Sequence, residues 1–212
     1  MKKIISFSLF NNYAMYNYGI IANIHLAQKI FPDWICRVYC NNTTNPNTVE
    51  EIKKYNNAEI YFVNEEENKI YPTIWRFWAI DDADVSIMIC RDADARLSNR
   101  EKNCVNIFEN SNYLFHSIRD NASHFDTMGG MWAIKKNDRI NIKNLSMNYF
   151  KHGYDADEYL LRTQISPIFK DSCLTHCSHF LNTFPELNTS NYFVGGKWDE
   201  NNFGQPIDFI FF

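Results

Sequence analysis

Short apolar runs alternate with helix-length segments along the first half of this chain, and this alternation restricts the possible folds more than any other feature. The expected strands are residues 4–10, 34–40, 59–63 and 85–90, and the expected helices between them are residues 20–30, 48–55 and 73–80. Strands that alternate with helices indicate an α/β domain, because each helix carries the chain back so that successive strands pair in parallel.

The second half of the chain continues the pattern less regularly. Further strands are expected at residues 113–118 and 131–134, and further helices at 98–109, 145–150 and 157–165, the last ending before Pro167. A chain of 212 residues has the usual length of one α/β domain. We therefore predict a single domain over residues 1–212, with one mixed, mostly parallel sheet flanked by helices.

Charge and hydropathy argue against several classes of protein. The net charge of −4 lacks the basic excess that a dedicated nucleic-acid-binding protein carries. No apolar run approaches the roughly 18 residues that a membrane-spanning helix needs. The first twelve residues do not read as a secretory signal, because polar residues interrupt their apolar stretch. We expect a cytoplasmic protein without a membrane span and without a nucleic-acid partner.

Two well-known nucleotide-binding signatures are missing from the sequence. Neither G-x-G-x-x-G after the first strand nor G-x-x-x-x-G-K-[ST] occurs. A dehydrogenase of the usual dinucleotide-binding type and a P-loop enzyme are therefore disfavoured. A nucleotide-type ligand at the carboxyl ends of the strands remains the expectation for this order of strands and helices.

The tripeptide Asp-Ala-Asp occurs three times, at residues 82–84, 92–94 and 155–157. The copy that contains Asp92 and Asp94 directly follows the apolar strand 85–90, where the sheet ends and ligands bind. Mn²⁺ and Mg²⁺ typically use one or two carboxylates together with substrate phosphates. This placement predicts a divalent-metal site, for which His176 is the expected third ligand and His179 the less favoured alternative.

The cysteines support two interpretations. Cys173, His176, Cys177 and His179 form a compact group that could hold structural zinc. The C-x3-C spacing differs from the usual C-x2-C knuckle, so buried reduced thiols are the favoured interpretation.

A longer pattern surrounds the second Asp-Ala-Asp copy. It consists of Trp75-Arg76-Phe77, Arg91-Asp92-Ala93-Asp94-Ala95-Arg96-Leu97, Arg100-Glu101, His116, Arg119-Asp120, His124 and Gly129-Gly130-Met131-Trp132. Together these residues resemble a family of small GT-A-fold glycosyltransferases found in bacterial surface-polysaccharide clusters and in large DNA viruses, including a chlorella-virus member of about this length. The resemblance covers residues 4 to about 179.

The resemblance implies a GT-A-like fold, a UDP-sugar donor, a glycan or glycoprotein acceptor, and Mn²⁺ or Mg²⁺ held by Asp92, Asp94 and His176. For a viral member it implies the host cytoplasm. The first strand and its loop would contact the nucleotide base, and Arg76 would face the diphosphate or the donor sugar. The implied donor-binding residues are Ser6, Leu9, Tyr13, Arg76, Arg91, Asp92, Arg119, Asp120, Gly129 and Gly130.

The catalytic carboxylate is expected in the segment that begins the helix near residue 157. Asp157 is the main candidate for a general base and Asp155 is the reserve, while an ordinary helix N-cap is the alternative role for Asp157. Related sequences often carry Asp-Gln where this chain has Asp157-Glu158. Inversion and retention of the anomeric configuration both stay open, as do a nucleotidyltransferase-like metal enzyme and a catalytically silent nucleotide-sugar-binding domain.

Overall fold

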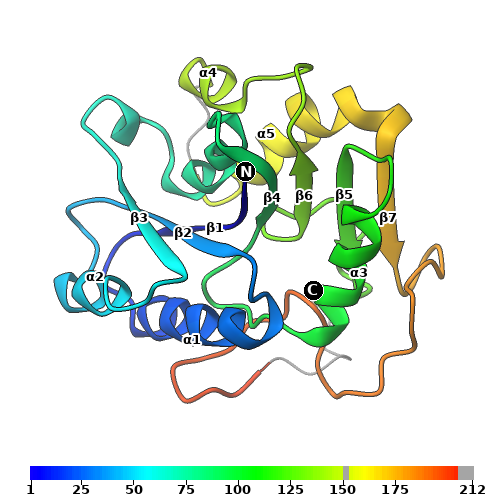
Figure 1. Ribbon diagram of the computed structural model, residues 1–212, viewed down its shortest axis with the longest axis horizontal. Coiled ribbons are helices and arrows are strands. Elements are labelled where there is room, and N and C mark those ends of the chain that lie inside the picture. The colour runs from blue at the N-terminus through cyan, green and yellow to red at the C-terminus, as the bar shows by residue number, and fades with distance from the viewer. Residues whose placement is uncertain (150–152, 205–212) are drawn as a thin grey trace.

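A seven-stranded mixed sheet forms the centre of the protein, whose computed structural model describes residues 1–149 and 153–204 (Figure 1). The strands are β1 (Lys2–Leu9), β2 (Ile35–Cys40), β3 (Ala58–Phe62), β4 (Val85–Cys90), β5 (Phe115–Arg119), β6 (Trp132–Lys135) and β7 (Cys173–Cys177). Their order is β3-β2-β1-β4-β6-β5-β7. Only β6 runs antiparallel to its neighbours among these strands, so the predicted mixed, mostly parallel sheet is confirmed.

Helices cover both faces of the sheet. The α-helices are α1 (Ala14–Ile30), α2 (Pro46–Ile52), α3 (Asn99–Glu109), α4 (Ile142–Met147) and α5 (Ala156–Leu160). Within the described residues, 3-10 helices span Glu67–Lys69, Pro72–Asp81 and Ser166–Ser172, and a π-helical turn spans Leu161–Ile165. Helices α1, α2 and α3 lie on one side of the sheet, and α4 and α5 lie on the other (Figure 1).

Each face of the sheet has its own apolar core. Strand β1 contributes to both, because successive side chains of a strand point to opposite faces. Ile4 packs in the core under the 3-10 helix Pro72–Asp81, and Ile5 and Phe7 pack in the core under α1 and α3. Packing against these two cores fixes the positions of the strand ends, which carry the candidate site residues.

Three sequence predictions about elements need correction. Helix α2 begins at Pro46, earlier than predicted, because Asn45 caps it by accepting a 2.9 Å hydrogen bond from the Asn47 amide. Pro167 does not end the helical region, because a 3-10 helix continues through Ser172. Strand β7 was not predicted at all. The helix predicted at residues 98–109 is confirmed as α3, and Ser98 caps it, since its hydroxyl accepts from the Glu101 amide.

The predicted helix 145–150 corresponds to α4, and its last residue, Phe150, lies outside the described residues. Within the described part of the chain, no helix has the length and apolar character needed to cross a bilayer.

Candidate active site

A cavity of about 870 Å³ lies at the carboxyl ends of β1 and β4. Its walls come from the segment that joins β1 to α1, the turn after β4, the loop 122–131, the segment 154–158 and the C-terminal segment 193–197. The carboxyl edge of a mostly parallel sheet is the usual ligand-binding edge. The sequence predicted a ligand at the carboxyl ends of the strands, and the structure has a cavity there.

A second cavity, of about 1120 Å³, lies between α1 and the C-terminal segment 186–202. It is larger, but Glu186 is the only acidic residue in its described lining. The cavity at the end of β4 contains Asp92, Asp94, Asp155, Asp157 and Glu158. Because metal and acid–base chemistry both require such carboxylates, this carboxylate-rich cavity is the candidate active site.

Arg76 links the two acidic segments of the cavity. It lies in the 3-10 helix Pro72–Asp81 and is 6% exposed. One terminal nitrogen pairs with Asp92, and the other donates to Asp157 Oδ2 at 2.7 Å. Burial by itself lowers the pKa of Arg76, but the charges of Asp92 and Asp157 raise it well above its ordinary value. The guanidinium therefore stays charged and holds both carboxylates in position.

Gly129 and Gly130 allow the backbone to lie against these carboxylates. A Cβ at Gly129 would be 2.5 Å from Asp157 Oδ2 and 3.1 Å from Arg76 Nη2, and a Cβ at Gly130 would overlap the Asp92 carboxyl group. The sequence prediction was that these glycines let the backbone approach the donor. In the structure, both glycines lie against acidic side chains, and Gly129 also lies against Arg76. A side chain at either position would collide with these groups.

Asp94 carries negative charge that the protein compensates poorly. It is 4% exposed and lies in the cavity wall next to Asp92. Burial and the neighbouring Asp92 raise the pKa of Asp94 from its ordinary 3.8 to about 6, although Lys197 lowers it somewhat. A buried carboxylate that resists ionisation in this way marks a place where a cation is favourable.

Asp94 should therefore reduce the stability of the fold at neutral pH. Because its pKa is higher in the folded than in the unfolded chain, the fold is favoured below about pH 4 and loses that advantage as the pH rises through about 6. Asp94→Asn changes the free energy of unfolding at each pH. We expect this change to be more stabilising at pH 8 than at pH 4 by about 1–3 kcal/mol. Urea denaturation at both pH values measures this difference.

Asp84 provides the comparison, because it belongs to another Asp-Ala-Asp copy and its pKa is lowered by Lys2. Asp84→Asn should give a small change of the opposite sign. An Asp94→Asn protein with the same pH dependence of stability as the wild type would contradict the expected charge penalty.

His176 does not join Asp92 and Asp94. It lies in β7, and strands β5 and β6 separate β7 from β4. Its Nδ1 is 2.8 Å from Nε2 of His116, and burial lowers the pKa of both imidazoles. The sequence prediction of a three-ligand site with His176 is corrected by this placement, since β7 could not be recognised as a strand.

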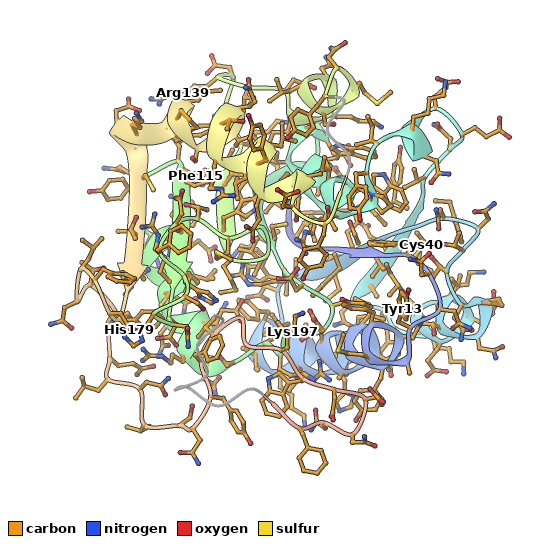
Figure 2. The ribbon with its side chains drawn as sticks, turned by 180° about the vertical axis from the view of Figure 1, so that it is seen from behind. Tyr13, Cys40, Phe115, Arg139, His179 and Lys197 are labelled. Atoms are coloured by element: carbon orange, nitrogen blue, oxygen red, sulfur yellow. The ribbon has the colours of Figure 1, made fainter. Side chains whose placement is uncertain are left out.

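His179 follows β7 and lies well apart from Lys197 in Figure 2. Within residues 1–149 and 153–204, no three His, Cys, Asp or Glu side chains converge to hold a metal ion. The cysteines are unpaired thiols, and Cys173 is the one among them that is partly exposed.

Two predicted donor-binding residues form buried ion pairs instead. Arg91 pairs with Glu101 and donates to the carbonyl oxygens of Cys90 and Trp132. Asp120 accepts two hydrogen bonds from Arg100, at 2.8 and 2.9 Å. Neither lines the cavity, and both hold adjacent chain segments together, while their donor-binding roles stay predictions.

Three further predicted residues also lie outside the cavity lining. Ser6 and Leu9 are buried within β1, and Arg119 donates to the carbonyl oxygen of Phe125 at 3.2 Å. In contrast, Tyr13 at the start of α1 and Asp155 before α5 do line the cavity.

Three cavity residues were not assigned a role from the sequence. Lys197 reaches the cavity from the C-terminal segment (Figure 2). His124 is buried, and burial lowers its pKa to about 4, so the imidazole is neutral. Glu158 lies beside Asp157. The Gly195-Gly196 pair before Lys197 is a turn signal that could have marked a loop over the site.

No protein-family profile matches the chain, and no curated protein sequence matches it significantly. Solved structures do match. A glycosyltransferase involved in the glycosylation of the major capsid of PBCV-1 has a TM-score of 0.52 at 14% identity, over 85% of this chain and 84% of that chain. A Pyrobaculum calidifontis mannosyltransferase, solved with GDP-Man and Mn²⁺, has a TM-score of 0.55 at 14% identity, over 83% of this chain and 55% of that chain.

The chain has the GT-A fold. Another structural match is the 4-diphosphocytidyl-2C-methyl-D-erythritol synthase of Anaerococcus prevotii, with a TM-score of 0.54 at 8% identity over 89% of this chain and 92% of that chain. The fold expected from the sequence resemblance is thereby confirmed, while sequence identities this low leave activity to the site itself. The chain spans about half the length of the mannosyltransferase.

The chemistry of Asp92 and Asp94 fits a hard divalent cation. Both carboxylates line the cavity, and burial together with the neighbouring Asp92 raises the pKa of Asp94, which a bound cation would oppose. Mg²⁺ and Mn²⁺ sites of this kind complete their coordination with substrate phosphates and water. Two carboxylates are therefore enough protein ligands for such a metal site.

Proposed function

We propose that this protein is a metal-dependent glycosyltransferase that moves a sugar from a nucleoside-diphosphate donor, with UDP as the nucleotide, to a hydroxyl group of a glycan or glycoprotein acceptor. The observation that carries this proposal is the pair Asp92 and Asp94, which follows β4 and lines a cavity in a GT-A fold, with the buried Asp94 having a raised pKa. Mn²⁺ or Mg²⁺ held by this pair would neutralise the charge of the departing diphosphate.

The donor diphosphate is proposed to lie between the carboxylate pair and Lys197. Lys197 and Asp94 face the same cavity and interact electrostatically. Arg76 also lines the cavity, but its two terminal nitrogens are already engaged by Asp92 and Asp157. Its proposed role is therefore to hold these carboxylates, and Lys197 is the better candidate for a phosphate contact.

The acceptor is proposed to bind at the mouth of the cavity. Tyr13, Phe125 and Tyr154 line the cavity and are 62%, 67% and 76% exposed. They come from three different segments of the chain that line this cavity. Exposed aromatic rings bind the apolar faces of sugar rings and of bases, which suits a site with two such ligands.

A nucleotidyltransferase is the second candidate function. It is favoured by the likeness to the Anaerococcus prevotii synthase, whose name includes a diphosphocytidyl product. The two functions release different products. A glycosyltransferase frees a nucleoside diphosphate from a nucleotide sugar, whereas a nucleotidyltransferase frees pyrophosphate from a nucleoside triphosphate.

The direct test measures both products with and without Mn²⁺. The purified protein is incubated with a panel of nucleotide sugars and, separately, with nucleoside triphosphates and sugar phosphates. We expect Mn²⁺-dependent release of nucleoside diphosphate from at least one nucleotide sugar. Pyrophosphate release alone would favour the nucleotidyltransferase, and donor binding without turnover would indicate a silent binding domain.

The metal site is tested by donor binding to Asp94→Asn. This change should weaken Mn²⁺-dependent donor binding more than about 100-fold, because it removes a direct ligand. Calorimetric titration with the nucleoside diphosphate, with and without Mn²⁺, measures the effect. Asp84→Asn makes the same chemical change in an exposed Asp-Ala-Asp copy and should bind like the wild type. Equal donor affinity in the two variants would place the metal elsewhere.

A further inference from the structure

Asp94 lies in the irregular segment that joins β4, which ends at Cys90, to α3, which begins at Asn99. The backbone groups of such a segment are not paired by a strand ladder or a helix, so they need other hydrogen-bond partners where they are buried. The residues on either side of Asp94, Ala93 and Ala95, are both buried. The position of the Asp94 carboxylate therefore depends on what holds this stretch of backbone.

The side chain of Asn23 bonds to this backbone on both sides of Asp94. Asn23 lies in α1 and is 1% exposed. Its amide nitrogen donates to the carbonyl oxygens of Ala93 at 3.3 Å and Ala95 at 2.8 Å. Its amide oxygen accepts from the backbone amide of Leu97 at 3.0 Å. One buried amide group thus uses both its donor and its acceptor on three backbone groups, which fixes the path of the chain between them.

Helix α1 also lies against this segment at Gly19, one helical turn before Asn23 and on the same face of the helix. A Cβ at Gly19 would lie only 2.1 Å from the carbonyl oxygen of Ala93. A residue without a side chain is needed where the backbone comes this close to the helix. Gly19 and Asn23 therefore act together, the first by leaving room for the segment and the second by bonding to it.

The two carboxylates of the proposed metal site are held in different ways. The Asp92 side chain is ion-paired with Arg76. For Asp94, the hydrogen bonds from Asn23 hold the backbone on either side of it. A cation that both carboxylates bind must meet them at nearly fixed distances, so the backbone of Asp94 has to be fixed as firmly as the side chain of Asp92.

We propose that Asn23 is a positioning residue for the divalent cation, because it fixes the backbone around Asp94 so that this carboxylate and Asp92 bind one ion together. This inference rests on the proposed metal-dependent function. Asn23 is not among the residues that line the cavity, so its effect on the metal has to pass through Asp94. Changing a residue that orients a metal ligand typically costs about 10–100-fold in metal affinity or activity.

The first test compares UDP binding by Asn23→Ala and Asn57→Ala. Asn57 is the matched control, because its side chain also bonds to α1, donating to the carbonyl oxygen of Ile24 at 3.0 Å, but it lies next to β3. With Mn²⁺ present, Asn23→Ala should raise the Kd for UDP about 10–100-fold. In EDTA its Kd should stay within about threefold of the wild-type value. Asn57→Ala should match the wild type in both calorimetric titrations.

The second test repeats the change in the Asp94→Asn protein, with titrations extended to millimolar Mn²⁺. If Asn23 acts through Asp94, Asn23→Ala should then weaken Mn²⁺-dependent binding by no more than about threefold, because the effects of residues that act together are not additive. Gly19→Ala gives a further measurement that keeps the Asn23 amide. Its Cβ would push against the carbonyl oxygen of Ala93, so the same selective loss of Mn²⁺-dependent binding is expected.

The selectivity for Mn²⁺ separates positioning from general support of the fold. An Asn23→Ala protein that binds UDP with wild-type affinity in Mn²⁺, or that loses as much affinity in EDTA as in Mn²⁺, would overturn the proposal. A full additional loss in the Asp94→Asn background would also overturn it. Binding of UDP by the wild-type protein with the same affinity in Mn²⁺ and in EDTA would instead count against the metal-dependent function itself.

Discussion

Arg76→Met is expected to lower the free energy of unfolding by about 3–5 kcal/mol, because it leaves a buried carboxylate without its counter-charge. Asp157 contributes most of this loss, since its side chain is 5% exposed whereas that of Asp92 is 39% exposed and can be solvated. Methionine fills a similar volume, so a cavity is not the main cause of the effect. Urea denaturation at pH 7 measures the change.

Two comparisons separate the charge effect from a general loss of packing. Arg139→Met removes an exposed ion pair with Asp171 and should leave the free energy of unfolding almost unchanged. The double variant Arg76→Met/Asp157→Asn removes both buried charges and should recover part of the lost stability. An Arg76→Met protein as stable as the Arg139→Met protein would show that the buried charges are not coupled as the structure indicates.

Gly130→Ala is expected to weaken donor binding about 10²-fold, which is the scale of effect caused by misplacing a reacting group by about 1 Å. The added Cβ would overlap the Asp92 carboxyl group. Asp92 cannot move freely, because it is ion-paired with Arg76. The alanine would therefore displace the carboxylate from the geometry in which it holds a metal ion. Titration of the protein with the nucleoside diphosphate and Mn²⁺ measures the loss.

Gly196→Ala is the control for this substitution. A Cβ at Gly196 would lie 3.2 Å from its nearest neighbour, Phe193, which small adjustments can relieve. We expect its donor affinity to stay within about threefold of the wild-type value. Equal affinity in Gly130→Ala and the wild type would mean that Asp92 does not contribute to donor binding.

The sequence predicted the elements around the carboxylate pair well. The run Val85–Cys90 is apolar throughout and forms β4 with the predicted bounds. A strand covered on both faces has this pattern, so its end could be located before the structure was known. The position of Asp92 and Asp94 at the ligand-binding edge followed from that strand end alone.

Other parts of the site could not be predicted, because they depend on contacts between distant segments. Arg76 and Asp157 are 81 residues apart in the chain, and the 2.7 Å bond between them has no local sequence signal. Arg91 and Asp120 resembled donor-binding residues, yet each is neutralised by a partner within the protein. A charged residue near a motif does not reveal whether its partner is a ligand or another side chain.

The sequence by itself determined the α/β class, the mostly parallel sheet and the carboxylate pair after β4. These follow from the spacing of apolar residues, which is a local property of each strand and helix. Only the tertiary structure decided that His176 packs against His116 rather than joining Asp92 and Asp94. It also placed Lys197 and Glu158 in the cavity. These placements depend on strand order and on how separate segments meet across the sheet, and the charge and burial of each side chain follow from that arrangement.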